Sequence, residues 1–315
     1  MPDQPAIVVD RLTKKFGAFV AVDALTFDVA RGEVFGFLGA NGAGKSTTIR
    51  MLCGLLKATS GRALVGGADV TADPEAVKRR IGYMSQRFSL YELLTVDENI
   101  RFYGALYGLT GERFAARHGF ALEMAGLKGR ERDLARDLSG GWRQRLALGC
   151  ALLHEPPIVF LDEPTGGVDP ISRRAFWRLI DDLSQRGTTV LVTTHYLDEA
   201  ERCDRVAIVH AGRLAALGTT SDLKRAFHDR PIVEVRAREP VKAMTVLDGL
   251  SLVEKTSLFG TAVHAVLRGA STSVDAVRAA LAAAGVAVTS IGPVVPSLED
   301  VFLDVVDRMV DKGVA

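Results

Sequence analysis

Apolar and polar positions alternate in two short segments near the start of the chain. The segments are Ile7–Leu12 and Ala24–Val29, and Gly17 lies between them. An alternation with a period of two residues is typical of a strand with one buried face. The stretch from Ile7 to Ala30 therefore predicts an antiparallel edge region of a sheet.

A second pattern begins at Glu33–Leu38, where an apolar strand runs directly into a glycine-rich turn. Apolar residues then recur at helical spacing over Lys45–Leu56. This order predicts a strand, a loop and a helix. Pro157–Asp162 and Thr188–Thr194 are short, dense apolar runs, which favour strands buried on both faces. We expect these runs to form a parallel core sheet.

The pattern between Arg87 and Asp137 is helical and amphipathic, with breaks at Gly108, Gly126 and Gly129. We therefore expect a helical subdomain over residues 87–137, inserted between strands of the core sheet.

The chain from Pro231 onward alternates between strand and helix patterns in the order βαββαβ. That order is typical of a ferredoxin-like module. Ser297, with Asp300 three residues later, indicates the start of the closing helix. We therefore expect an α/β domain over residues 1–220 and a small α+β domain over residues 221–315. The expected elements of the small domain are Ile232–Val235, Pro240–Leu250, Leu252–Leu258, Ala262–Leu267, Thr272–Ala284, Val286–Ile291 and the closing helix.

Composition narrows the class of protein. The chain has 315 residues, of which 48% are hydrophobic and 24% charged, so it can bury a sizeable core, which argues against disorder or a fibre. Its 39 Lys and Arg balance 38 Asp and Glu, and the chain therefore has no excess charge for nonspecific binding to nucleic acid. We expect no nucleic-acid partner.

The sequence also bears on the compartment. The longest uncharged stretch, Ala279–Leu298, contains two glycines and two prolines and does not predict a membrane-spanning helix. The first residues lack the basic and then apolar pattern of an export signal, so we expect a cytoplasmic protein. Cys53, Cys150 and Cys203 are scattered, which favours buried thiols over a metal site.

Residues Gly39–Ser46 fit the pattern Gly-x4-Gly-Lys-Ser, between a predicted strand and a predicted helix. Glycines let successive backbone N–H groups point at phosphate oxygens, and the helix N-terminus adds a positive dipole end. We expect Lys45 to reach the β- and γ-phosphates and Ser46 to bind Mg²⁺. A glycine-rich structural turn would fit the same spacing when taken alone.

Asp162 and Glu163 end a run of four apolar residues, Ile158–Leu161. A buried strand would deliver both carboxylates to the edge of the sheet beside the phosphate loop. Phosphoryl transfer requires positioning and charge neutralisation. We therefore expect Asp162 to orient Mg²⁺ and Glu163 to act as general base. A solvated strand end is the alternative for an isolated Asp-Glu pair.

Ser139-Gly140-Gly141, with Gln144 after it, stands at the start of another apolar helical stretch. This segment resembles the signature of ATP-binding-cassette (ABC) ATPases. An N-capped helix with a flexible entrance would explain it equally well in isolation. The resemblance extends along residues 6–220, and it implies an ABC-type fold with ATP and Mg²⁺ as cofactors.

The resemblance implies roles for four further residues. Gln86 matches the glutamine that links the Mg²⁺ site to the helical subdomain, and His195 matches the switch histidine that contacts the γ-phosphate. Asp169 matches the loop that touches the opposite protomer, although Gly166–Asp169 departs from the more frequent family pattern Ser or Ala, then Gly-Leu-Asp. Phe16 stands where an aromatic ring, commonly Tyr, stacks on adenine, and a core role is its alternative.

The full set of expected site residues follows from these matches. The catalytic residues are Lys45, Gln86, Glu163 and His195, and the metal ligands are Ser46, Gln86 and Asp162. The expected nucleotide-binding residues are Phe16, Gly39, Asn41, Gly42, Ala43, Gly44, Lys45, Ser46, Thr47, Ser139, Gly140, Gly141, Gln144 and Asp169.

The resemblance also implies partners. In the family each signature closes the ATP site of a second subunit, so a chain with one phosphate loop and one signature is expected to form a homodimer. Residues 83–109 and Pro296–Leu303 look like bacterial drug exporter ATPases of the daunorubicin-resistance type. We therefore expect a separate membrane permease that holds the chain at the inner face of the membrane. An importer ATPase, or a soluble ABC ATPase acting on ribosomes, is the alternative.

Overall fold

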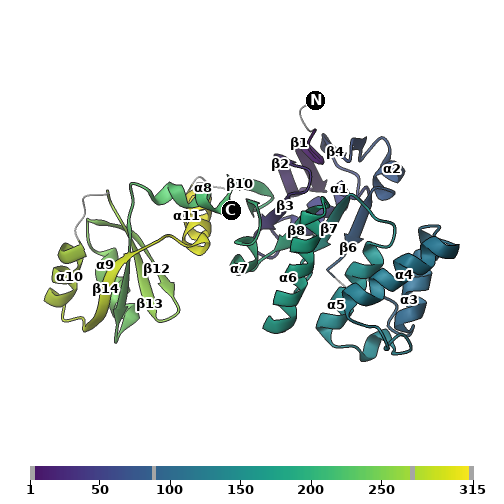
Figure 1. Ribbon diagram of the computed structural model, residues 1–315. Coiled ribbons are helices and arrows are strands. Elements are labelled where there is room, and N and C mark those ends of the chain that lie inside the picture. Colours follow the sequence, from purple (N-terminus) through teal and green to yellow (C-terminus); the bar gives the residue numbers. More distant parts are fainter. Residues whose placement is uncertain (1–3, 87–89, 270–273, 312–315) are drawn as a thin grey trace. The chain divides into compact units, whose positions relative to one another are not determined.

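The computed structural model of the protein describes residues 4–86, 90–269 and 274–311 (Figure 1). Contacts within the chain divide it into two compact units. The C-terminal unit is Thr220–Asp307, and the N-terminal unit is the chain up to Thr219 together with the residues from Arg308 onward.

An antiparallel sheet with strand order β2-β1-β4-β5 forms one layer of the N-terminal unit. Gly17, with a φ of 59°, makes the turn between β1 and β2. The strands carry the alternating pattern near the start of the chain, so the predicted antiparallel edge region is confirmed. Their bounds are β1 Ile7–Phe16, β2 Phe19–Val29, β4 Ser60–Val65 and β5 Ala68–Asp69.

A second sheet, with strand order β10-β9-β3-β8-β7-β6, forms the centre of this unit. The strands from β9 to β6 are parallel, and β10 pairs antiparallel with β9. The predicted parallel core sheet is therefore confirmed. Its strands are β3 Val34–Leu38, β6 Ile81–Met84, β7 Ile158–Asp162, β8 Thr189–Thr194, β9 Arg205–His210 and β10 Arg213–Gly218.

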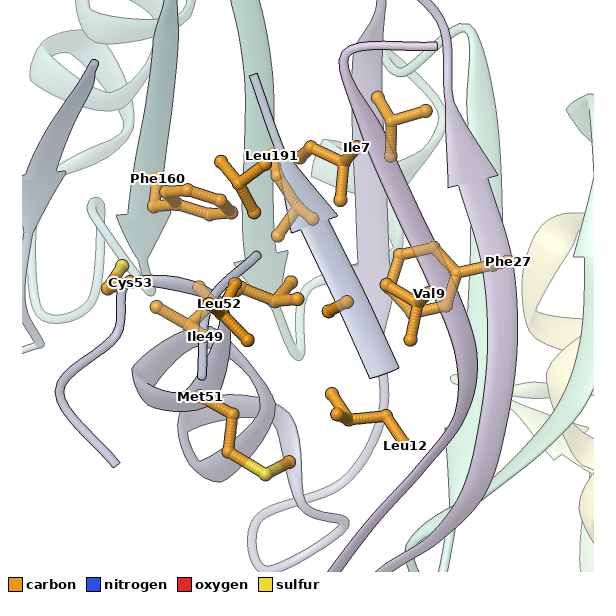
Figure 2. Packing of buried hydrophobic residues seen from close by; sticks show 14 of the residues in the cluster. Ile7, Val9, Leu12, Phe27, Ile49, Met51, Leu52, Cys53, Phe160 and Leu191 are labelled. Atoms are coloured by element: carbon orange, nitrogen blue, oxygen red, sulfur yellow. The ribbon is translucent and has the colours of Figure 1, made fainter. Parts of the chain in front are cut away.

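Helix α1 (Lys45–Leu52) packs with both sheets in the main hydrophobic core. Figure 2 shows α1 side chains among those of β1, β2, β7 and β8. The helix ends earlier than the sequence predicts, because Gly54 turns the chain with a φ of 67° and packs against Pro74. The labelled core residues include Ile7, Val9, Phe27, Ile49, Met51, Leu52, Phe160 and Leu191.

The helical subdomain is built from α3 (Val96–Leu106) and α4 (Gly111–Ala125). Both pack against α5 (Gly140–Ala151), so the helical region continues beyond the predicted end at residue 137. Its predicted start at residues 87–89 lies outside the described residues. The other helices of this unit are α2 Pro74–Lys78, η1 Ala135–Asp137, α6 Pro170–Gln185 and α7 Leu197–Ala200.

The thiols of Cys53, Cys150 and Cys203 are buried and unpaired by disulfides, as the sequence predicts. Burial raises the pKa of each of them well above the ordinary value for a thiol.

The C-terminal unit contains an antiparallel sheet of order β12-β13-β11-β14. This order is that of a ferredoxin-like module, as predicted. Edge strand β14 begins two residues later than expected and runs through Pro293, which an edge strand tolerates. The elements of the chain from Thr220 onward are α8 Thr220–Lys224, η2 Arg225–Phe227, β11 Ile232–Ala237, α9 Pro240–Asp248, β12 Val253–Phe259, β13 Ala262–Leu267, α10 Val274–Ala283, β14 Val288–Val294 and α11 Leu298–Asp311.

Candidate active site

The glycine-rich loop connects the end of β3 to the start of α1, as expected. Gly42 and Gly44 adopt left-handed backbone conformations, with φ of 83° and 98°. A Cβ atom at Gly39 would lie 2.5 Å from the carbonyl oxygen of Val209, and one at Gly44 would lie 2.5 Å from that of Ala21. The path of the loop therefore requires glycine at these positions.

Lys45 is buried at the first position of α1. Its Nζ donates hydrogen bonds to the carbonyl oxygens of Gly39 at 2.8 Å and Ala40 at 3.1 Å. The same nitrogen lies 3.1 Å from Oε1 of Glu163. The loop cation and the second carboxylate of the β7 edge therefore form a buried ion pair.

Asp162 is the last residue of β7 and is fully buried. Its Oδ1 accepts hydrogen bonds from Ser46 Oγ at 3.0 Å and from Thr193 Oγ1 at 2.8 Å. Burial raises the pKa of the Asp162 carboxyl, and the hydrogen bonds from Thr193 and Ser46 only partly oppose this shift. Asp162 therefore joins the phosphate loop to the neighbouring strand β8.

The other carboxylate oxygen of Asp162, Oδ2, is buried and has no hydrogen-bond partner among the described residues. A carboxylate oxygen beside a serine hydroxyl is the oxygen chemistry that Mg²⁺ prefers. Ser46 and Asp162 therefore fit a magnesium ion. Gln86, the third expected ligand, directs its Nε2 to Oε2 of Glu163 at 3.1 Å.

Glu163 follows β7 in a left-handed conformation that is unusual for a residue other than glycine, with a φ of 48°. Its backbone N–H donates to Oγ1 of Thr193 at 2.9 Å and to the carbonyl oxygen of Thr193 at 3.2 Å. Nδ1 of His195 lies 3.2 Å from Glu163 Oε2, within ion-pair distance but without hydrogen-bond geometry. The structure thus brings the four expected catalytic residues together.

A cavity of about 370 Å³ lies over the phosphate loop. Two aromatic side chains, Phe16 and Phe19, line it and are 50% and 64% exposed. The exposure of Phe16 argues against its alternative role in the core. Sequence reasoning did not identify Phe19 or Ala21. The lining residues are Phe16, Phe19, Ala21, Asn41, Gly42, Gly44, Lys45, Ser46, Thr47, Gln86 and Glu163.

The signature segment starts helix α5. Ser139 is the N-cap residue, but its side chain makes no capping hydrogen bond. A Cβ atom at Gly141 would lie 2.5 Å from Cβ of Ser172 in α6. The ring of Trp142 stacks under the guanidinium group of Arg130, whose Cζ lies 3.9 Å from the ring centroid. This cation–π contact gives the bulky residue beside the turn a structural role.

Among the described residues, those of the signature do not line the cavity over the phosphate loop. Five of the expected nucleotide-binding residues, which the family resemblance assigns to the ATP site of a second subunit, are not among the described residues that line this cavity. Gln144 is buried, and its Oε1 has no hydrogen-bond partner among the described residues. The five residues are Ser139, Gly140, Gly141, Gln144 and Asp169.

Asp169 is the N-cap residue of α6. Its Oδ1 accepts hydrogen bonds from the backbone N–H groups of Ile171 and Ser172, each at 3.0 Å. Hydrogen bonding with Ser172 lowers the pKa of the Asp169 carboxyl. Because Gly141 packs against the same Ser172, the Asp169 loop and the signature turn adjoin each other.

Comparison with known sequences identifies the family. The ABC transporter family matches residues 22–166, and a family described as the C-terminal domain of DrrA1-3-like ATP-binding proteins matches residues 218–306. The daunorubicin resistance ATP-binding protein DrrA3 of Streptomyces coeruleorubidus is 39% identical over 317 residues, covering 98% of each chain. This chain belongs to the ABC transporter ATP-binding proteins. It also carries the DrrA-like C-terminal domain.

A further relative is longer than this ABC protein. The probable multidrug ABC transporter ATP-binding protein YbhF of Escherichia coli is 51% identical over 223 residues, which cover 71% of this chain. The aligned region spans 39% of YbhF, so the chain matches about two fifths of that relative's length.

Solved structures resemble the nucleotide-binding part of this ABC protein. The ATP-binding subunit of an ABC transporter is 34% identical with a TM-score of 0.65, covering 71% of this chain and 93% of its own. A dimeric post-hydrolysis state of the cassette MJ0796 with ADP and Pi is 27% identical with a TM-score of 0.62, covering 68% and 98%. These neighbours confirm the ABC-type fold.

The structure also places residues at the candidate site that belong to none of the sequence motifs of this ABC protein. Thr193 contacts Asp162 because β7 and β8 pair in a register that places these two residues opposite each other. Such a contact depends on the order of the strands in the sheet, which no short segment of the sequence reveals.

In the described parts of the chain, no helix combines the length and apolar character needed to cross a membrane.

Proposed function

We propose that this chain binds ATP with Mg²⁺ and hydrolyses it to drive an ABC exporter. One observation carries this proposal: Lys45, Ser46, Asp162 and Glu163 meet within hydrogen-bonding distance at the carboxyl edge of the parallel sheet. A cation, a hydroxyl and two carboxylates at a phosphate-binding loop are the groups that phosphoryl transfer requires.

Nucleotide binding is assigned to the cavity over the phosphate loop. Backbone N–H groups of the loop and the N-terminus of α1 would bind phosphate oxygens, and Lys45 would neutralise the β- and γ-phosphates. Phe16 would stack on adenine, and Phe19 lies at the same cavity. Asn41 and Thr47 complete the polar side of the cavity.

Hydrolysis is assigned to Glu163 as general base. Its carboxylate is held by Lys45 and Gln86 and lies beside His195, so the proton of an attacking water has a defined acceptor. Ser46 and Asp162 would hold Mg²⁺ with Gln86 beside them, and the ion would neutralise phosphate charge. His195 would contact the γ-phosphate.

A homodimer is the proposed functional form. Ser139, Gly141 and Asp169 lie outside the cavity of their own chain, and this supports a role for them at the ATP site of a second copy. The related cassette MJ0796 has been solved as a dimer. ATP would bind the closed dimer better than the open one, so binding closes the dimer and hydrolysis opens it.

The partner that uses this work is proposed to be a separate membrane permease of an efflux system for drugs or other small hydrophobic compounds. Relatives named for daunorubicin and multidrug resistance support this class of cargo. The helical subdomain supports docking of a permease, because it exposes apolar side chains that a partner would cover. These side chains are Tyr91, Leu93, Phe102 and Leu106.

The general-base role is tested with Glu163→Gln. This variant should bind ATP, accumulate as a dimer in size-exclusion chromatography and lose at least about 100-fold in turnover, because the amide cannot accept the proton. Lys45→Ala is the comparison variant and should lose ATP affinity instead. Turnover of Glu163→Gln at the wild-type rate would remove Glu163 from the base role.

The transporter assignment is tested by purifying tagged Glu163→Gln from its native cells with ATP and mild detergent. One co-purifying protein with several membrane spans would support the exporter. A further requirement for an external substrate-binding protein would support an importer instead. Recovery of ribosomes without a membrane protein would contradict both transport assignments.

A further inference from the structure

A buried carboxylate outside the proposed catalytic set lies behind the active site. Glu199 of α7 is 1% exposed, and both of its carboxylate oxygens are engaged. Oε1 accepts a hydrogen bond from the hydroxyl of Thr165, and Oε2 accepts one from Thr194 Oγ1 at 2.7 Å. A buried charge is retained only where its partners compensate for the loss of water.

The two threonines adjoin the two catalytic side chains, Thr165 in the turn after Glu163 and Thr194 at the end of β8 before His195. Thr165 lies two residues after Glu163, and Thr194 immediately precedes His195. Thr194 Oγ1 also accepts a hydrogen bond from the backbone N–H of Tyr196 at 2.9 Å, on the far side of His195. Glu199 therefore joins the turn of the proposed base to the turn of the proposed switch histidine.

Arg173 of α6 connects the same carboxylate to a third element. Its Nε lies 3.4 Å from Glu199 Oε1, at ion-pair distance without hydrogen-bond geometry. Its guanidinium Cζ also lies 4.1 Å from the ring centroid of Tyr196. Asp169 is the N-cap residue of α6, so through Arg173 the Glu199 carboxylate also contacts the helix that follows the Asp169 loop.

The turn at Glu163 needs such a restraint. A non-glycine residue with positive φ, such as Glu163, has a strained backbone, and that conformation persists only where the surrounding structure holds it. Thr193 holds the backbone of Glu163 on one side, and the bond from Thr165 to Glu199 holds the next turn. Without the Glu199 carboxylate, the Glu163 and His195 turns lose the link between Thr165 and Thr194, and the backbone hydrogen bonds of Glu163 to Thr193 remain.

We propose that Glu199 is a positioning residue for ATP hydrolysis, which keeps Glu163 and His195 at their observed spacing by holding Thr165 and Thr194 together. This inference rests on the proposed ATPase function. Glu199 does not line the cavity, so its contribution should be to the rate of the chemical step and not to nucleotide affinity.

The test is Glu199→Gln in the full chain. Glutamine keeps the shape, but an NH2 donor replaces one of the two carboxylate oxygens, so the threonine on that side loses its acceptor, and the negative charge beside Arg173 is lost. We expect kcat per folded molecule to fall about tenfold through loss of alignment, with the Kd for ATP changed less than about twofold. Asp198→Asn is the matched control, because Asp198 lies on the same helix, is exposed, and contacts Arg173 at 3.8 Å. It should keep the wild-type kcat.

A second variant keeps the proposal testable if Glu199→Gln does not fold. Thr165→Val removes the hydroxyl that donates to Glu199 and should lower kcat about threefold with an unchanged Kd for ATP. Where both variants fold, the double variant should lose less than the product of the single losses, because both break one linkage.

The outcomes separate the two proposals. A wild-type chain that binds no ATP or does not turn it over would overturn the proposed function. Normal turnover in the wild type, together with wild-type kcat in folded Glu199→Gln or Thr165→Val, would overturn only the positioning role. Equal losses in kcat and ATP affinity would also overturn it, since they would indicate a general role in the structure of the pocket.

Discussion

Two adjacent glycines of the signature turn face different surroundings. A Cβ atom at Gly140 would meet nothing within 4 Å, whereas one at Gly141 would collide with the Cβ and Oγ of Ser172, each at 2.5 Å. Neither glycine is among those with positive φ, so space and not backbone conformation distinguishes the two sites. The close contact between α5 and α6 therefore depends on Gly141.

Gly141→Ala should destabilise the N-terminal unit by about 1–3 kcal/mol, because an extra methyl group forces α5 and α6 apart. Gly140→Ala is the matched control and should be neutral or slightly stabilising, because alanine favours helix and meets open space. Urea unfolding followed by the fluorescence of Trp142 and Trp177 measures both variants. Equal stability of the two variants would show that the contact with Ser172 relaxes without cost.

At the scale of single elements, the sequence predicts most strands and helices because apolar residues recur in them at the regular spacing of a strand or a helix. The strand Ala262–Leu267 is observed at its predicted bounds, and the antiparallel strands follow the alternating segments. The errors occur where tertiary contacts end an element, as at Gly54 after α1, or prolong it, as in edge strand β14.

The candidate site shows the same division. The phosphate loop, Asp162 and Glu163 are predictable because each is a short segment with its chemistry in consecutive residues. Thr193 and Glu199 are not, because their roles come from strand pairing and from turns that meet only in the folded chain. Phe19 lines the cavity from the far side of the β1–β2 turn, where no motif marks it.

The capping box at the start of α11 gives a test at this scale. Ser297 Oγ accepts from the backbone N–H of Asp300 at 3.1 Å, and Asp300 Oδ2 accepts from the backbone N–H of Ser297 at 2.8 Å. Ser297→Ala should therefore cost about 1 kcal/mol of stability. Ser290→Ala, an exposed serine of β14, should change stability by less than about 0.5 kcal/mol. Thermal unfolding followed by circular dichroism gives the unfolding temperature of each variant. Equal changes in unfolding temperature for the two variants would contradict the role of the cap.

At the scale of the whole molecule, each unit has its own hydrophobic core. The C-terminal unit also contains a cluster of charged side chains around His264, which is itself buried and 7% exposed. His264 Nδ1 lies 2.8 Å from Asp300 Oδ1, its Nε2 lies 3.7 Å from Glu234 Oε2, and its ring stacks on Phe259. Arg236 pairs with Glu234 in turn.

This cluster predicts a pH dependence for the C-terminal unit. Burial alone would lower the pKa of His264, but the hydrogen bond and charge of Asp300 and the charge of Glu234 outweigh it and raise that pKa. The stabilisation by protonated His264 is complete at pH values below the unfolded-state histidine pKa of about 6.5. It is lost as the pH rises through the higher pKa of His264 in the folded state. The pKa of Asp300 is lowered, despite burial, by His264 and Ser297, so its own contribution persists across neutral pH.

Raising the pH from 6 to 8 should therefore destabilise the C-terminal unit in the wild type and much less in His264→Gln. Scanning calorimetry of both chains at several pH values measures this difference. Identical pH slopes for the two chains would contradict a stabilising protonated His264.

The positions of the cysteines allow the local unfolding of one unit to be measured separately from that of the other. All three thiols, of Cys53, Cys150 and Cys203, belong to the N-terminal unit, and their raised pKa suppresses the reactive thiolate. A thiol reagent can modify them only as fast as that unit opens. The rate of thiol modification therefore measures the opening of the N-terminal unit alone and is insensitive to the opening of the C-terminal unit.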